Sequence, residues 1–331
     1  MDSCESYLLC IIKKYEERVL NYYKMGKLPT KVKTELLEDI ASKQLDDRSL
    51  CAAIDRVKRI YYGEVLKALE SLGYCVVDAT ARLNSRLLVG ASSGALAAVF
   101  DIGLSWDQVL GLPFIPGSSL KGLLRSWSIR YCLERYGDSQ ARRGCIEDFL
   151  ALTGLGGEAL TREELREYGS LLGVEKVELK EASAGLLLVF DAYPVRGGAG
   201  SGGCGLLEPD VLTPHYYRGG RPVQDEFEAT PVPVVHLSVA KGSEFRFTLA
   251  VPRLEKGLRS RLAGLLGLNR EAGEALIAFK LFSEAILEGV GARTGKGYGV
   301  FEITSLRASH SACQEAQPRA RRPGSLKWIL G

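Results

Sequence analysis

The sequence is poor in the residues that build metal sites, and it lacks the long apolar runs of membrane proteins. Only three histidines occur, and none of the eight cysteines forms a Cys-x-x-Cys pair. This argues against a structural zinc site of ordinary spacing. No apolar run approaches the roughly 18 residues that a membrane span needs. The N-terminus also lacks a signal-peptide pattern. We therefore expect a cytoplasmic protein with no metal, no cofactor and no membrane contact.

A strong basic charge is also missing. The formal net charge is only +3 over 331 residues, whereas a free nucleic-acid-binding domain usually carries a larger basic excess. The excess lies in residues 308–331, and the two preceding regions, 1–72 and 73–307, are each close to neutral. Any contact with RNA must therefore come from local clusters of cations, helped by neighbouring subunits.

Asparagine and methionine are scarce as well. The sequence has two methionines, and asparagine occurs only at Asn21, Asn84 and Asn269. A shortage of these thermolabile residues is typical of thermophilic proteins. For a cytoplasmic protein we predict buried, reduced thiols, although intracellular proteins of hyperthermophiles can carry disulfides.

Residues 1–72 have the period of amphipathic helices. Apolar residues recur at every third or fourth position over 7–22 and again over 50–69. Gly73 follows the second stripe as a C-terminal cap. We predict an N-terminal helical region, 1–72, whose apolar stripes pack on the rest of the chain. A face that docks a partner is the alternative interpretation.

The core, residues 73–307, combines strand and helix patterns. Strands are predicted at 74–89, 186–190, 231–239 and 245–251 and after residue 299, with helices from residue 117 and over 271–287. The order strand, helix, strand, strand, helix, strand is that of the ferredoxin-like, RRM-like fold, so we predict an α+β protein. The aromatic motif of the RRM is absent, so we do not predict that bases stack on the sheet.

Three further segments interrupt or follow this core. Residues 138–184 are rich in charge and predict a mainly helical insertion. Residues 196–205 hold six glycines, which exclude a helix and indicate a mobile loop. Residues 308–331 are basic and contain two prolines, and we expect a weakly ordered tail.

The most unusual stretch is residues 289–299, which we call the glycine segment. Five glycines alternate there with cations and an aromatic ring. Glycine permits left-handed backbone angles, and successive N–H groups in such a turn can surround an anion. Cations and a ring beside them suit an RNA backbone with a stacked base. The candidate RNA contacts are Gly291, Arg293, Thr294, Lys296, Gly297 and Tyr298. A tight helix-to-strand connection or a β-bulge is the alternative.

A second candidate site lies at the predicted start of the helix after residue 116. Pro-Gly-Ser-Ser is typical of a helix start, and a serine oxygen is expected to cap the first N–H groups. Lys121 and Arg125 share one face near the positive end of the helix dipole. Together with Ser118 and Ser119 they predict a phosphate site. An ordinary capped helix with a solvated basic face is the alternative.

Other candidates lie between these motifs. Arg86 is interleaved with the apolar residues of the first strand and is a further candidate for RNA contact. His215 stands beside two tyrosines and could contact RNA or act as a general base. His236 lies in an apolar strand and is expected to be a satisfied core residue. Weaker still is a divalent-metal site, whose ligands would be Asp191, Glu208, Asp210 and His215.

Several of these stretches together resemble the RAMP superfamily of CRISPR-associated proteins. The motifs are Phe114 to Arg125, the glycine segment, and between them Val189–Pro194, Thr213–Tyr216 and Pro231–Val234. The first two motifs are shared by many RAMP proteins. The three between them are similar to the sixth subunit of Cmr (type III-B) complexes. The resemblance covers about residues 80–306.

The resemblance implies a subunit of an RNA-guided effector complex in antiviral defence. Such a subunit caps the protein filament near the 3′ end of the guide RNA and holds guide and target RNA without cutting them. Its partners would be the neighbouring RAMP backbone subunits and the small helical subunit. The same superfamily also contains guide-processing enzymes. The alternative is therefore a metal-independent endoribonuclease for CRISPR RNA with His215 as general base.

Overall fold

The computed structural model describes the predicted core and the second half of the N-terminal helical region. The described residues are 33–35, 37, 47–90, 100, 102–154, 184–198, 204–213, 217–218, 221–225, 227 and 233–308. Several predictions fall outside them, namely His215, residues 199–203 of the glycine-rich loop, residues 155–183 of the insertion and the tail from residue 309. In the described part, no helix is both long and apolar enough to cross a membrane.

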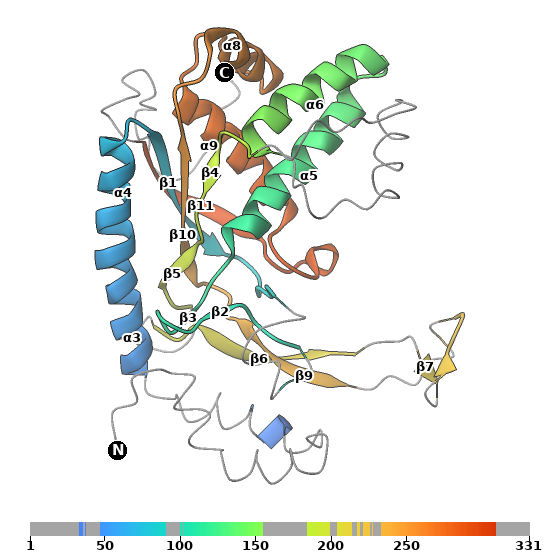
Figure 1. The fold of residues 1–331 in the computed structure, drawn as a ribbon. Helices are drawn as coiled ribbons and strands as arrows, with labels where there is room; N and C mark the ends of the chain where they lie inside the picture. The colour runs from blue at the N-terminus through green and yellow to red at the C-terminus, as the bar shows by residue number, and fades with distance from the viewer. Residues whose placement is uncertain are drawn as a thin grey trace.

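An antiparallel sheet lies at the centre of the fold (Figure 1). Its strands are β1 (Cys75–Leu83), β4 (Leu188–Val189), β5 (Tyr193–Arg196), β10 (Glu244–Val251) and β11 (Phe301–Ala308). The order across the sheet is β11-β1-β10-β4, and β5 also pairs with β10. With helices between the strands, the chain has the α+β class that the sequence predicted.

Helices cover both faces of this sheet (Figure 1). The helices α5 (Gly117–Arg135) and α9 (Glu274–Ala285) pack on each other and on one face. The other face is covered by α3 (Asp47–Arg56), the π-helical turn η1 (Val57–Tyr61) and α4 (Tyr62–Ser71). Leaving out the insertions, β1, α5, β4, β10, α9 and β11 follow the predicted order of core elements along the chain.

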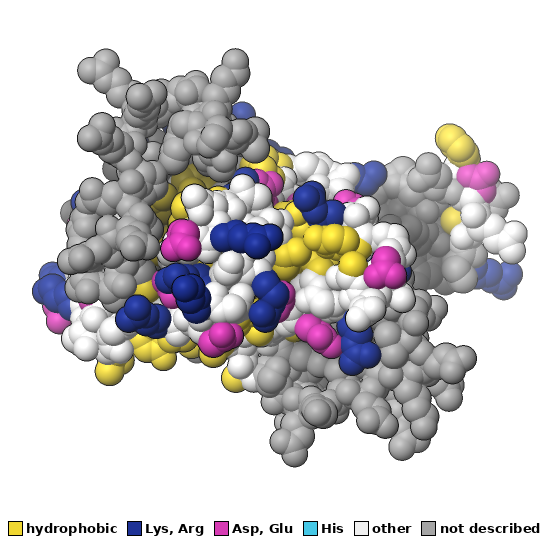
Figure 2. All heavy atoms as spheres, turned by 90° about the horizontal axis from the view of Figure 1, so that it is seen from above, with side chains coloured by type: hydrophobic (Ala, Val, Ile, Leu, Met, Phe, Trp, Pro, Cys, Tyr) yellow, Lys and Arg dark blue, Asp and Glu magenta, His cyan; other side chains and the backbone are white. Residues whose placement is uncertain are grey.

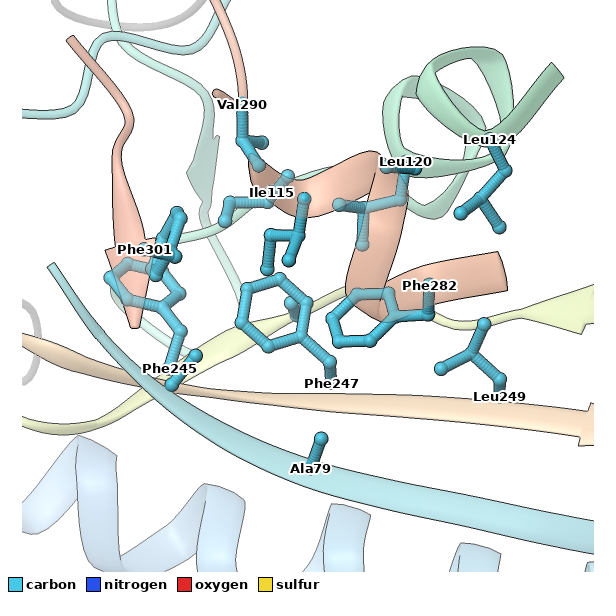
Figure 3. Packing of buried hydrophobic residues seen from close by; sticks show 14 of the residues in the cluster. Ala79, Ile115, Leu120, Leu124, Phe245, Phe247, Leu249, Phe282, Val290 and Phe301 are labelled. Carbon is cyan, nitrogen blue, oxygen red and sulfur yellow. The ribbon is translucent and has the colours of Figure 1, made fainter. Parts of the chain in front are cut away.

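The alternation of side chains along the strands supplies both faces with apolar contacts. On the α9 side, Phe247 of β10 contacts Phe282 with ring centroids 5.2 Å apart (Figure 3). On the α4 side, Val76 and Ala250 pack under Leu69. The central strands β1 and β10 are therefore mostly buried on both faces, whereas Glu302, Thr304 and Ser305 of the edge strand β11 are exposed.

Tyr62 anchors the N-terminal helices to the sheet. Its hydroxyl donates to the carbonyl oxygen of Arg246 at 2.9 Å and accepts from the N–H of Tyr193 at 3.2 Å. The Arg246 guanidinium lies 4.4 Å from the centre of the Tyr62 ring. The same guanidinium donates from Nε to Asp78 Oδ1 at 2.6 Å. In the described part of region 1–72, the helices therefore pack on the core through polar as well as apolar contacts.

A two-stranded ribbon extends away from the sheet. It consists of β6 (Leu207–Leu212) and β9 (Val234–Val239), paired antiparallel. The short strands β7 (Tyr217–Arg218) and β8 (Arg221–Pro222) pair at its far end (Figure 1). An antiparallel bridge between Val239 and Leu87 joins the ribbon to the chain just after β1.

The remaining elements are short or belong to the insertions. The helix α6 (Ser139–Thr153) begins after Asp138, whose carboxylate accepts from the N–H of Ala141 at 2.7 Å. The helix α8 (Lys256–Leu265) packs against α6. The others are β2 (Trp106–Asp107), β3 (Leu112–Pro113) and the 3₁₀ turns η4 (Ile286–Glu288) and η5 (Thr294–Lys296).

The prediction of reduced thiols is wrong for all five described cysteines, which are disulfide-bonded, namely Cys51, Cys75, Cys132, Cys145 and Cys204. Cys51 and Cys204 form a disulfide that ties α3 to the residues before β6. Cys132 and Cys145 form a second one between α5 and α6. Such cross-links stabilise a fold mainly by restricting the unfolded chain. No Cys-x-x-Cys motif marked these pairs, which are 153 and 13 residues apart.

Replacing Tyr62 by Phe is expected to lower the free energy of unfolding by about 1–3 kcal/mol, because buried backbone groups lose their partner. Urea unfolding measures the loss. Tyr74→Phe is the matched control, since the half-buried Tyr74 hydroxyl has no hydrogen bond to the described residues. Its effect should stay within about 0.5 kcal/mol. Equal losses in the two variants would contradict the anchoring role of Tyr62.

Candidate functional site

The glycine segment, residues 289–299, connects η4 to β11 through a tight turn. Arg293 has φ of 62° and ψ of 26°, and among the described residues it is the only non-glycine with a positive φ. Four glycines of the segment also have positive φ values, namely Gly289, Gly291, Gly297 and Gly299. A non-glycine residue in this region costs free energy and is retained only where the surrounding structure holds it. The conformation of Arg293 is therefore imposed by its contacts.

The backbone of the segment packs closely on the chain that leaves β1. The N–H of Ala292 donates to Leu88 O and that of Gly299 to Arg86 O, both at 2.7 Å. A Cβ atom at Gly291 would overlap the Leu88 carbonyl oxygen. The predicted alternative, a tight helix-to-strand connection, therefore describes this backbone. Gly291 is needed there because its missing side chain lets the turn pack directly on the backbone of Leu88.

The predicted cradle of consecutive N–H groups forms only in part. The N–H groups of residues 296–299 all donate within the chain, which corrects the expectation for Lys296, Gly297 and Tyr298. Those of residues 293–295 have no hydrogen-bond partner in the described part of the chain. Only the first half of the turn is thus available to an outside anion.

Arg293 and Tyr298 form one unit on this turn. The Arg293 guanidinium lies 4.6 Å from the centre of the Tyr298 ring, and its Nη1 donates to the Tyr298 hydroxyl at 3.1 Å. That hydroxyl donates in turn to Oδ2 of Asp210 at 2.6 Å. Burial, followed by the hydrogen bond to Asp210, raises the pKa of Tyr298. The phenol therefore stays protonated and acts as a donor to the carboxylate.

Asp210 joins this unit to Arg86. It lies on β6 and is only 5% exposed. Its Oδ1 accepts from Arg86 Nη1 at 3.0 Å and from the N–H of Val211 at 2.8 Å. Arg86 also donates from Nε to Glu208, and this hydrogen bond is the main reason that its pKa is raised. We call these side chains the Asp210 network, with members Arg86, Glu208, Asp210, Arg293 and Tyr298.

Three of the four predicted metal ligands, Asp191, Glu208 and Asp210, lie in the described part of the chain and bind other groups, whereas His215 lies outside it. Glu208 and Asp210 bind Arg86, and Asp191 contacts the start of α5. Within the described ranges, no group of three or more His, Cys, Asp or Glu side chains could hold a metal ion. The carboxylates of the ribbon are therefore partners of cationic side chains.

His236 faces the same carboxylate from the neighbouring strand. It is fully buried, and its Nε2 lies 3.5 Å from Asp210 Oδ2. Neither ring nitrogen makes a hydrogen bond of good geometry. Burial lowers the pKa of His236, with Asp210 acting in the opposite direction. The prediction of a core residue is confirmed, but the prediction of satisfied hydrogen bonds is wrong.

The predicted serine cap of α5 is also wrong. The helix starts at Gly117 after Pro116, and no side chain of the cap position makes a hydrogen bond. Instead, Asp191 Oδ1 accepts from the N–H of Gly117 at 2.6 Å. Ser118 and Ser119 lie inside the first turn, with exposed side chains. A carboxylate from a distant loop thus occupies the helix end where an external anion was expected.

Lys121 and Arg125 differ in their surroundings. Arg125 donates from Nη2 to Thr153 O at 3.3 Å, at the end of α6, so it has a structural contact. Lys121 is half-buried and forms no ion pair with a described carboxylate. Burial, and then the nearby Arg125, lower its pKa. Of the two predicted cations, Lys121 is the one that remains available to a ligand.

The apolar residues of the two motifs share one core. Figure 3 shows Val290, at the start of the glycine segment, together with Ile115 and Leu120 above the Phe247 ring. The polar residues of the motifs are held separately, since no hydrogen bond or ion pair between described residues joins Lys121 or Arg125 to the glycine segment. The two candidate sites are thus neighbours in packing and separate in their polar contacts.

Gly299→Ala is expected to lower the free energy of unfolding by more than about 1 kcal/mol. Its φ is +68°, and a Cβ would overlap the Val290 carbonyl oxygen. Gly295→Ala is the matched control in the same turn, because no atom lies within 4 Å of the added Cβ. Thermal unfolding compares the two variants. Equal stability of both would contradict the packing role of Gly299.

The lowered pKa of His236 predicts how stability depends on pH. Because its ordinary value is 6.5, the unfolded chain binds more protons than the folded chain below that pH. The free energy of unfolding is therefore expected to fall as the pH drops through 6.5. His236→Leu should weaken this dependence. Urea unfolding of both proteins on either side of this pH measures it, and identical pH profiles would contradict the assignment.

Comparisons with known proteins give the family. The model of the RAMP superfamily matches residues 80–302. The chain is 29% identical over 292 residues to the CRISPR system subunit Cmr6 of Saccharolobus solfataricus, covering 86% of this chain and 79% of that protein. It is 27% identical over 269 residues to Cmr6 of Pyrococcus furiosus, covering 72% and 71% of the two chains.

A solved structure is also similar. A chain in a cryo-EM structure of the type III-B Cmr-beta complex bound to cognate target RNA is 25% identical, with a TM-score of 0.48, and covers 87% of this chain and 81% of its own. The match of the family model, which spans most of the core, confirms the predicted resemblance. This chain belongs to the RAMP superfamily.

Proposed function

We propose that this chain is an RNA-binding, architectural subunit of a type III-B CRISPR (Cmr) effector complex, without catalytic activity of its own. It holds guide RNA and the guide–target duplex near the 3′ end of the guide and caps the subunit filament. Its partners are the neighbouring RAMP backbone subunits and the small helical subunit. The supporting likenesses are the two Cmr6 relatives. The single observation that carries the proposal is the Arg293–Tyr298 unit on the glycine segment.

We also infer that the core is ferredoxin-like. In the antiparallel order β11-β1-β10-β4, the first core strand, β1, lies between the last, β11, and the third, β10. The second core strand, β4, lies at the edge beside β10. The two core helices, α5 and α9, pack together on one face. This agrees with a split βαβ arrangement. Because α3 and α4 lie on the opposite face, the central strands offer bases no open surface, and we assign the RNA contacts to the loops.

The glycine segment has the groups that a phosphate backbone requires. Among the described residues Arg293 has no carboxylate partner, so most of its N–H donors remain free for phosphate. Lys296, the last residue of η5, is exposed and forms no ion pair with a described carboxylate. Thr294 adds a hydroxyl between them. Contacts of this kind hold RNA independently of its sequence.

The start of α5 supplies a second, weaker contact. The side chains of Ser118 and Ser119 are exposed, and Lys121 has no ion pair with the carboxylates that the structure describes. Asp191 already occupies the helix end, so a phosphate here is bound by these side chains and not by the helix N–H groups. Arg125 contributes chiefly by supporting α6.

The low net charge of +3 means that RNA contacts need local clusters of cations. On the face seen from above α8 (Figure 2), Lys and Arg side chains are interspersed with Asp and Glu. A mixed surface of this kind gives little long-range attraction for RNA. The affinity must therefore come from a few well-placed cations.

The endoribonuclease alternative has no specific observation in its favour. His236 is fully buried and cannot reach a substrate. His215, the predicted general base, lies outside the described residues. We therefore retain the architectural function. RNA incubated with the assembled complex is expected to be recovered uncut by this subunit, with no difference in the His215→Ala variant.

The double variant Arg293→Ala/Lys296→Ala is expected to weaken binding of labelled guide RNA by the assembled complex. The loss should shrink as salt rises, because each lost phosphate contact lowers the salt slope by about one. Filter binding or fluorescence anisotropy across about 50–200 mM salt measures both quantities.

The matched control is Arg59→Ala/Lys67→Ala. It removes the same charge from exposed positions on η1 and α4, which cover the other face of the sheet. RNA affinity and salt slope should stay unchanged in this variant. If the glycine-segment variant assembles and binds RNA as tightly as the control, the chain is a protein-only scaffold and the proposed function is wrong.

A further inference from the structure

A buried carboxylate lies directly beneath the proposed RNA contact. Asp210 is 5% exposed, so it cannot itself meet RNA. Three donors reach it within 3.0 Å, one each from Arg86, Val211 and Tyr298. The Arg86 guanidinium and the Val211 N–H can only donate, so the carboxylate accepts from both. An ionised carboxylate can only accept hydrogen bonds.

This fixes the direction of the next hydrogen bond. The single proton of the Tyr298 hydroxyl points to Asp210, with a separation of 2.6 Å. The lone pairs of the same oxygen are therefore left for Arg293 Nη1, which lies 3.1 Å away. Replacing the acceptor Asp210 by an amide group allows the phenol proton to turn towards Arg293, where it would repel the guanidinium. The charge of Asp210 thus decides whether Tyr298 can accept from Arg293.

Arg293 depends on such support because its backbone is strained. Its φ of 62° is unfavourable for a residue with a side chain. Its described side-chain contacts are both with Tyr298, the ring at 4.6 Å and the hydroxyl at 3.1 Å. The ring is in turn tied to β6 through its hydroxyl. Without that tie, the side chain of Arg293 would lose its fixed direction.

We infer that Asp210 is the positioning residue of the RNA contact, acting through Tyr298 to aim Arg293 at phosphate. The inference rests on the proposed function and adds a residue that never touches RNA. It predicts that the effects of Asp210 and Arg293 on RNA binding are coupled, because the first acts only through the second.

The test is a double-mutant cycle on the assembled complex. Asp210→Asn and Arg293→Ala are each expected to weaken the binding of labelled guide RNA on the order of tenfold. Each is also expected to lower the slope of the salt dependence by about one. The double variant should bind no more weakly than Arg293→Ala alone. Asp210→Asn keeps the size of the side chain, so the Asp210 pocket remains filled.

The chain offers a close control for stability. Asp78 is also a buried carboxylate, 7% exposed, and it binds Arg246, whose guanidinium stacks on the Tyr62 ring. This arrangement lies under the N-terminal helices, away from the glycine segment. Asp78→Asn is expected to lower the unfolding midpoint as Asp210→Asn does, but to leave RNA affinity and salt slope unchanged.

Three outcomes separate the possibilities. If Arg293→Ala binds RNA normally, the proposed function fails at this site and the inference fails with it. If Arg293→Ala weakens binding but Asp210→Asn does not, or the two losses add, only the positioning role is overturned. If Asp78→Asn weakens RNA binding as much as Asp210→Asn, the effect is a general loss of stability and the inference is again overturned.

Discussion

The ionised carboxylate of Asp210 is the constraint on which the candidate site depends. Removing a carboxylate from water is costly unless charged and neutral donors surround it. Here the donors come from separate parts of the chain, Arg86 after β1, Val211 on the ribbon and Tyr298 in the glycine segment. Satisfying one buried charge therefore holds the sheet, the ribbon and the glycine segment in one arrangement. Arg293, the half-buried cation of that arrangement, keeps a positive φ within these surroundings.

In the proposed function, coverage of the sheet restricts the surfaces that are left for RNA. In an RRM-like protein one face of the sheet is free for bases, whereas here α3 and α4 lie across it, anchored by Tyr62. The other face carries α5 and α9. Polar contacts are consequently left to the loops at the ends of the strands, where the glycine segment lies. This is consistent with a subunit that holds the RNA backbone and does not read bases.

The start of α5 shows how a favourable sequence pattern can be used differently. Two serines follow a proline and a glycine, as at many helix starts, yet Asp191 satisfies the first N–H group. The close approach of residues 189–191 to Gly117, where a Cβ would meet the Val189 carbonyl oxygen, makes this possible. The serines are left exposed beside Lys121. Lys121 thus remains available to a ligand, whereas the helix end is occupied by Asp191.

The sequence by itself determined the α+β class, the order of the core elements, the superfamily and the identity of Arg86, Arg293 and Tyr298 as residues of interest. Helical and strand periods, and the backbone freedom of glycine, are local properties, so they can be recognised without coordinates. Tertiary structure alone decided which distant groups meet. Asp191 accepts a hydrogen bond from the first residue of a helix that lies 74 residues away in the sequence. Cys51 forms a disulfide with a cysteine 153 residues away, and Asp210 accepts a hydrogen bond from a hydroxyl 88 residues away. These pairs form because packing of the chain brings the two residues together in space. A contact between residues that are far apart in the sequence leaves no local pattern from which it could be predicted.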